Sequence, residues 1–141
     1  MEARFVVCSA LVSIDQRSNA LSLFNLCEEF NIPAFPFAFP HMAVVALLTR
    51  EANEPSEPAN VEMRFFLDAQ EIFRTPIRLN FQQHLRMRFV VDVQAIVLPR
   101  PGSLRVVIQH DGVELGQWKI QVNSIGPGAF AAAVRPAVPP A

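Results

Sequence analysis

The sequence has few of the residues that build common ligand-binding and catalytic sites. It contains no tyrosine, one tryptophan and five glycines among 141 residues. Glycan sites usually offer tryptophan or tyrosine beside aspartate and asparagine, and phosphate-binding loops are rich in glycine, so neither kind of site is favoured. No serine lies in a Gly-x-Ser-x-Gly turn, which argues against a hydrolase of that type.

Histidine is equally sparse. His41, His84 and His110 show no metal-ligand spacing, and each lies in a segment typical of a loop, linker or turn. The acidic segment at residues 51–60 lacks the Asp-x-Asp-x-Asp-Gly pattern that wraps calcium, and we expect it to be a solvated loop. We therefore predict no catalytic residue, no metal and no cofactor, and we expect the protein not to be an enzyme.

Charge is also scarce, at 18% of residues and a formal net charge of −1. No global field would recruit nucleic acid or an anionic membrane, so neither is expected as a partner. No segment approaches the ~18 consecutive apolar residues that span a bilayer. Residues 1–12 are apolar but interrupted by Glu2 and Arg4, which predicts no signal peptide and a cytoplasmic location.

The only cysteines are Cys8 and Cys27. In a reducing compartment we expect two free, buried thiols. A disulfide is the alternative if the two residues face each other across neighbouring strands.

Residues 98–122 carry the clearest structural pattern in the chain. A Pro-Gly pair leads into an alternating strand, Asp111-Gly112 follows, and a second alternating strand ends the segment. Glycine adopts positive φ without steric cost and aspartate tolerates it, so Asp-Gly between such strands predicts a β-hairpin. Trp118 is expected to be a core anchor that faces the strand at residues 85–98.

The remaining strands follow the same logic of alternation or continuous apolar runs. Pro76 suggests that its strand is an edge strand or carries a bulge, and the longest strand is expected at residues 85–98. With the hairpin the count is about eight, which predicts an all-β antiparallel sandwich, Ig-like or jelly-roll-like. The predicted strands lie at residues 4–14 (a buried strand), 20–26, 42–50, 61–68, 72–81 and 85–98.

The body and the end of the chain differ in composition. Residues 1–122 are predicted to form a single sandwich domain. Residues 123–141 are rich in alanine and proline and are expected to be largely disordered. The segment 130–134 either docks as one helical turn or does not order.

Three stretches carry a recognisable combination of motifs. They are Leu-Ser-Leu-Phe-Asn at residues 21–25, the Phe-Pro segment at 35–41, and the Pro-Gly…Asp-Gly…Leu-Gly hairpin at 101–116. Together they resemble a family of small bacterial proteins known only as a domain of unknown function. The resemblance covers roughly residues 3–122 and implies a sandwich without known chemistry. Residues 68–71 depart from it, because family members commonly have a glycine in that turn.

Five arginines form the first candidate site. They fall on the predicted polar faces of three successive strands, and they would form one basic patch if those strands were neighbours. Such a patch could bind phosphate or a carboxylate-bearing partner. The alternative is cross-strand ion pairing with nearby acids on a wet sheet face. The five are Arg64, Arg74, Arg78, Arg86 and Arg88.

Phe35, Phe37 and Phe39 form the second candidate site. Their segment contains three prolines and is expected to be an extended crossing between parts of the fold. We expect that the three rings cannot easily all bury on one side unless the whole segment is covered. They either plug the open end of the sandwich or form an apolar patch for another subunit or protein.

These observations favour a non-enzymatic protein-interaction module that self-associates through a sheet face or edge. Its expected partner is a second copy or another protein. The alternative is a protein that binds a small or anionic ligand on the arginine-lined sheet face.

Overall fold

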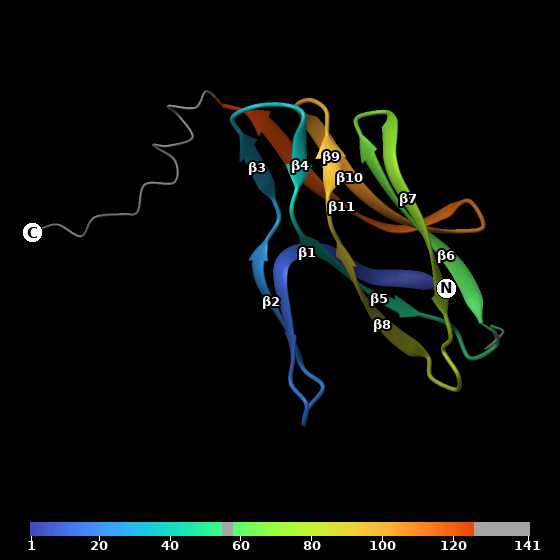
Figure 1. Cartoon of the computed structure of the whole chain (residues 1–141). Helices are drawn as coiled ribbons and strands as arrows, with labels where there is room; N and C mark the ends of the chain where they lie inside the picture. The colour runs from blue at the N-terminus through green and yellow to red at the C-terminus, as the bar shows by residue number, and fades with distance from the viewer. Residues whose placement is uncertain (55–57, 126–141) are drawn as a thin grey trace, which may run out of the picture.

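The computed structural model describes residues 1–54 and 58–125, and these residues form eleven strands. Two sheets stack face to face, and a two-stranded ribbon lies beside them (Figure 1). The four-stranded sheet has the order β2 (Leu21–Leu26), β1 (Glu2–Ile14), β5 (Met42–Thr49), β8 (Arg86–Val93). The five-stranded sheet has the order β3 (Glu29–Ile32), β11 (Val113–Ser124), β10 (Gly102–His110), β6 (Ala59–Leu67), β7 (Gln70–Leu79). The ribbon consists of β4 (Phe37–Phe39) and β9 (Ile96–Leu98).

This architecture confirms the predicted all-β sandwich. Every strand pair is antiparallel except β3 with β11, which is parallel. The predicted count of about eight was too low because β3, β4 and β9 have only three or four residues each. Strands of that length are too short to show a period of two.

The core lies between the inner faces of the two sheets. In β6 the odd-numbered residues Val61, Met63, Phe65 and Leu67 are fully buried, as their alternation predicts. Phe65 lies opposite Val106 and Leu67 opposite Leu104 on β10. Strand β5 lies between β1 and β8, and its side chains are almost all buried, which accords with its continuous apolar sequence.

The predicted hairpin is β10 and β11. Asp111 and Gly112 have φ of 49° and 77°, as the Asp-Gly pair predicts. Gly116 allows β11 to lie close to β1, because a Cβ atom there would be 2.9 Å from both Ala3 Cβ and Val6 Cγ2. Trp118 is half-buried, and its indole N–H donates to the carbonyl of Cys27 at 2.7 Å, so it joins β11 to the chain before β3.

The predicted strand at residues 85–98 is two strands, and the prediction of one long strand was wrong. Ala95 has φ of 57° and ends the extended conformation. β8 pairs with β5 in the four-stranded sheet, whereas β9 pairs with β4 in the ribbon. Nothing in the local sequence marks this break, because alanine rarely adopts positive φ.

Strand β7 is an edge strand, as Pro76 predicts. It follows β6 through the turn at Asp68 and Ala69, and Asp68 has φ of 52°. Asp68 therefore adopts a left-handed backbone conformation that is more often adopted by glycine. This accounts for the absence of a glycine in that turn.

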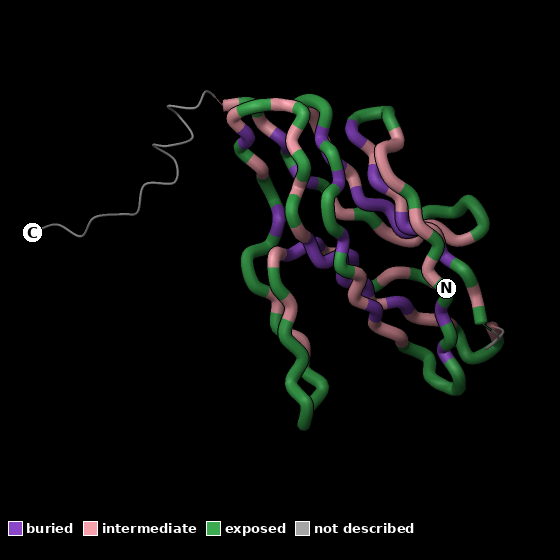
Figure 2. Tube along the Cα trace, in the orientation of Figure 1, coloured by how far each residue is buried: buried purple, intermediate pink, exposed green. Residues whose placement is uncertain are grey.

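Residues 10–26 form a hairpin that we call the arm. It comprises the end of β1, a turn and β2, and it extends away from the sandwich (Figure 1). The prediction of a fully buried strand at residues 4–14 was wrong for this end of β1, which is largely exposed (Figure 2). Ser9 is fully buried where the arm leaves the body.

The arm's turn is held by Asp15, whose Oδ1 accepts backbone N–H groups of Arg17 and Ser18 at 2.9 and 2.8 Å. The hydrogen bond from Ser18, followed by that from Arg17, holds the pKa of Asp15 below its usual range. The turn is therefore locally ordered although it is exposed.

The five-stranded sheet continues past the predicted domain boundary at residue 122. Asn123 and Ser124 still belong to β11 and pair with Asn31 and Ile32 of β3. The predictions of disorder after this point and of docking by residues 130–134 lie outside the described residues.

Candidate functional site

The five candidate arginines do not form one patch, because β6 and β7 are neighbours but β8 lies in the other sheet. Arg64 lies on β6, and Arg74 and Arg78 lie on β7, in the five-stranded sheet. Arg86 and Arg88 lie on β8 in the four-stranded sheet. The condition for one basic patch is therefore not met, since chain order does not determine which sheet a strand joins.

On the five-stranded sheet, Glu71 forms ion pairs with two of the arginines. Arg64 Nη2 donates to Glu71 Oε2, and Arg74 Nε donates to Glu71 Oε1 at 2.7 Å. The hydrogen bond from Arg64, followed by that from Arg74, lowers the pKa of Glu71 to about 2. This part of the arginine set forms ion pairs, as the structural alternative predicts.

On the same face of the five-stranded sheet, the ring of Phe66 forms cation–π contacts with two arginines. The guanidinium carbons of Arg64 and Arg105 lie 4.7 and 5.1 Å from the ring centroid of Phe66. Arg105 is additionally 3.9 Å from Glu114. Cation–π contacts and ion pairs thus occupy the arginines at the centre of this sheet face.

On the four-stranded sheet the arginines have no acidic partner among the described residues. Arg86 is exposed, and Arg88 is half-buried. Arg88 Nη1 and Nη2 each donate to the carbonyl oxygen of Asn19 at 3.2 Å, and Nη2 also donates to Asn19 Oδ1 at 3.1 Å. These bonds anchor the tip of the arm to β8, but their acceptors are neutral and leave the arginine charge uncompensated.

A groove of ≈ 760 Å³ lies between the arm and the outer face of this sheet. Its lining combines leucines of the arm, apolar residues of β1 and β5, and residues of β8. The lining residues are Phe5, Asn19, Leu21, Leu23, Leu47, Arg86, Met87 and Arg88. A second groove of ≈ 650 Å³ shares Phe5, Leu47 and Arg86 with the first and continues toward Arg4, Thr49, Arg50, Glu51 and Leu85.

The arm is apolar on both faces. Leu21 and Leu23 line the groove, so this face of the arm is turned toward the sheet. Leu11 and Phe24 are cross-strand partners, and alternation places them on the opposite face together with Leu26. These three side chains are 58%, 50% and 45% exposed, respectively.

Sequence reasoning did not identify the arm residues as candidates. An apolar strand normally indicates burial, and no local pattern tells which strand lacks a covering layer. One signal was present in the sequence: the hairpin carries apolar residues on both faces. In a two-layer sandwich only one face of a strand packs against the opposite sheet, so the other face is left without a covering layer.

The phenylalanine crossing connects β3 in the five-stranded sheet to β5 in the four-stranded sheet. Phe35, Phe37 and Phe39 are half-buried and all pack against the core. Phe37 and Phe39 are two residues apart in β4 and share one side of that strand, and Phe35 reaches the core from the preceding bend. The expectation that the three rings cannot easily all bury on one side was therefore wrong. Phe39 also stacks on Phe30, with ring centroids 4.6 Å apart. The crossing therefore covers one end of the sandwich and does not join the arginines.

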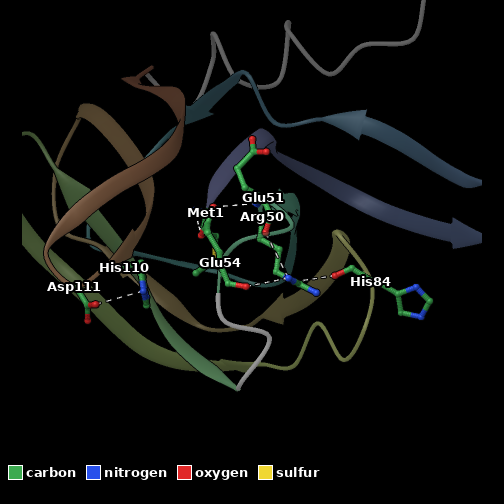
Figure 3. A network of polar contacts seen from close by, with 7 residues as sticks. All are labelled: Met1, Arg50, Glu51, Glu54, His84, His110 and Asp111. Atoms are coloured by element: carbon green, nitrogen blue, oxygen red, sulfur yellow. Dashed lines mark hydrogen bonds and ion pairs between the residues drawn. The ribbon is translucent and has the colours of Figure 1, made fainter.

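The polar contacts near the histidines are structural (Figure 3). Arg50 donates to the backbone carbonyls of His84 and Glu54 at 3.0 and 3.2 Å, and the imidazole of His84 points away from these contacts. The amino group of Met1 lies 2.6 Å from Glu54 Oε2. Backbone N–H donation from Glu51 and the Met1 ammonium lower the pKa of Glu54.

The other two histidines contact exposed carboxylates. His110 Nε2 lies 3.4 Å from Asp111 Oδ2, and His41 Nε2 lies 3.1 Å from Asp92 Oδ1. Both aspartates are exposed, unlike the buried carboxylate that would orient a catalytic histidine. Within residues 1–54 and 58–125, no three histidines, cysteines or acids are grouped so that they could hold a metal ion.

Cys8 and Cys27 are free and buried, as expected. The backbone N–H of Cys27 donates to the carbonyl of Cys8 at 2.8 Å, so the two residues are close neighbours. Burial raises the pKa of both thiols, and the proximity of Cys27 raises that of Cys8 further. Both side chains therefore serve the core as neutral thiols. The described residues include no helix long and apolar enough to cross a membrane.

Comparison with known proteins gives a family but no activity. The model of a family of unknown function, DUF6941, matches residues 4–123. No curated protein matches the chain. The matched range contains the arm, the groove and nearly all of both sheets.

Proposed function

Because the chain belongs to the DUF6941 family, for which no function is known, we propose a function from its surface: a non-enzymatic module that associates with a second copy of itself through the arm. The observation that carries this proposal is the distribution of exposed apolar side chains. Four of the eight large apolar residues that are exposed among the described residues belong to the arm. They are Leu11, Ile14, Phe24 and Leu26.

An apolar projection of this kind is costly in a monomer, because its side chains remain in contact with water. The outward face formed by Leu11, Phe24 and Leu26 would be shielded if two arms packed together. Full burial of a leucine or phenylalanine side chain stabilises by about 1.5–3 kcal/mol, so three half-exposed side chains from each copy make a substantial contribution.

The charge of the arm supports a second copy as its partner. Residues 10–26 contain one aspartate and one arginine, so two arms can approach without electrostatic repulsion. β2 is also an edge strand, and its outer edge can pair with the β2 of another copy in antiparallel fashion about a twofold axis.

The experiment is light scattering coupled to size exclusion, over a concentration series of the full chain. We expect a dimer for the native sequence and a monomer for the double variant Leu11→Ser, Phe24→Ser. Circular dichroism should remain unchanged in the variant, because both side chains lie on the exposed face of the arm.

The matched control is Val113→Ser, which removes an exposed apolar side chain at the distant tip of the β10–β11 hairpin. This variant should remain dimeric. A native protein that stays monomeric at high concentration would refute the proposal, and so would a double variant that still dimerises.

A further inference from the structure

The groove between the arm and the four-stranded sheet combines an apolar surface with arginine charge. Phe5 and Leu47 contribute from the sheet, and Leu21 and Leu23 contribute from the arm. Arg86 and Arg88 stand along the same groove on the edge strand β8.

The two arginines are arranged to hold an anion between them. They are two residues apart on one strand, so their side chains leave the same face about 6.5–7 Å apart. Neither arginine forms an ion pair within the described part of the chain. Arg88 donates hydrogen bonds only to the neutral oxygens of Asn19. A planar guanidinium matches the geometry of a carboxylate or phosphate, which would compensate this charge.

We propose that this groove binds a soluble amphiphile that has a carboxylate or phosphate head and an unbranched apolar chain. The head contacts Arg86 and Arg88, and the chain lies across Phe5 and Leu47 toward the arm leucines. The volume of ≈ 760 Å³ falls within the roughly 300–1,000 Å³ typical of small-molecule sites.

This site is separate from the self-association surface. It uses the face of the arm that carries Leu21 and Leu23, whereas the proposed dimer uses the face that carries Leu11 and Phe24. A monomeric Leu11→Ser, Phe24→Ser protein should therefore keep the ligand site. The two proposals can fail independently.

The test is calorimetric titration of the full chain with decanoate, acetate and decanol, each at a concentration where it is monomeric. We expect saturable binding of decanoate and at least tenfold weaker binding of the other two, because acetate lacks the chain and decanol lacks the charge. The variant Arg86→Gln, which leaves the bonds between Arg88 and Asn19 in place, should weaken decanoate binding about tenfold.

The matched control is Arg78→Gln, which removes an exposed arginine from the five-stranded sheet and should leave the affinity unchanged. Equal binding of acetate would reduce the site to an adventitious anion contact and overturn the proposal. Equal loss in the two arginine variants, or no binding of decanoate, would also overturn it. If the protein sediments with anionic vesicles but does not bind decanoate, the proposal that the ligand is a soluble amphiphile is rejected.

Discussion

The outer faces of the two sheets both carry arginines, but acidic partners lie beside Arg64 and Arg74 on the five-stranded sheet and not beside the arginines of β8. On the five-stranded sheet, Glu71 lies between Arg64 and Arg74 and binds both. On the four-stranded sheet, Arg86 and Arg88 have no carboxylate partner among the described residues, and an apolar groove lies beside them. An arginine pair is thus left available to an external anion where the fold supplies no carboxylate partner to it.

The largest expected effect concerns the contact that holds the two sheets together. Gly116→Ala places a Cβ atom 2.9 Å from Ala3 Cβ and Val6 Cγ2, so β11 and β1 must separate. We expect a loss of about 1–3 kcal/mol in the free energy of unfolding, as for other overpacked cores. Chemical denaturation measures it, and adding Val6→Ala should recover part of the loss. A fully stable single variant would show that the sheets are less tightly packed than described.

Leu47→Glu would make the two outer faces alike. Leu47 lies directly opposite Arg88 on the neighbouring strand, so the new carboxylate supplies the acidic partner that Arg86 and Arg88 lack among the described residues. Decanoate affinity should fall at least tenfold below that of Leu47→Gln, which removes the same apolar side chain without adding charge. Calorimetric titration of the two variants with decanoate measures this difference. Equal affinities would contradict the proposal that the unpaired arginines bind the carboxylate of the ligand.

Acid should weaken the ion pairs of the five-stranded face. The pKa of Glu71 is about 2 in the folded protein and lies below its unfolded value, so its ion pairs stabilise the fold above about pH 4.5. This contribution is lost progressively as the pH falls toward 2. Thermal unfolding of the native protein and Glu71→Gln should differ by a few degrees at neutral pH and converge near pH 2. A difference that is constant across this range would show that Glu71 acts through packing.

The smallest effect is expected for Arg86→Gln in the absence of ligand. Its side chain is exposed and forms no ion pair within the described residues, so the free energy of unfolding should change by less than about 0.5 kcal/mol. Denaturant titration provides the measurement. A larger loss of unfolding free energy would mean that Arg86 stabilises the fold and is not available to bind an anion.

The sequence predicts local features well and the arrangement of strands poorly. The burial of Val61 to Leu67 at every second position, the Asp111-Gly112 turn and the edge position of Pro76 each follow from a few adjacent residues. Sheet membership depends on distant partners, so no local pattern could separate Arg64 and Arg74 from Arg86 and Arg88. The break at Ala95 and the exposure of Leu11 likewise depend on the surrounding fold and not on the residues themselves.

The parallel pairing of β3 with β11 has a consequence for the order of folding. β3 lies in the first quarter of the chain, and its only partner among the described residues, β11, is the last strand. During synthesis β3 therefore emerges from the ribosome long before it can be paired, and the five-stranded sheet stays incomplete until residue 124 is available. The hairpins β6–β7 and β10–β11 close over short loops, so they can form earlier and provide the surface onto which β3 is finally added.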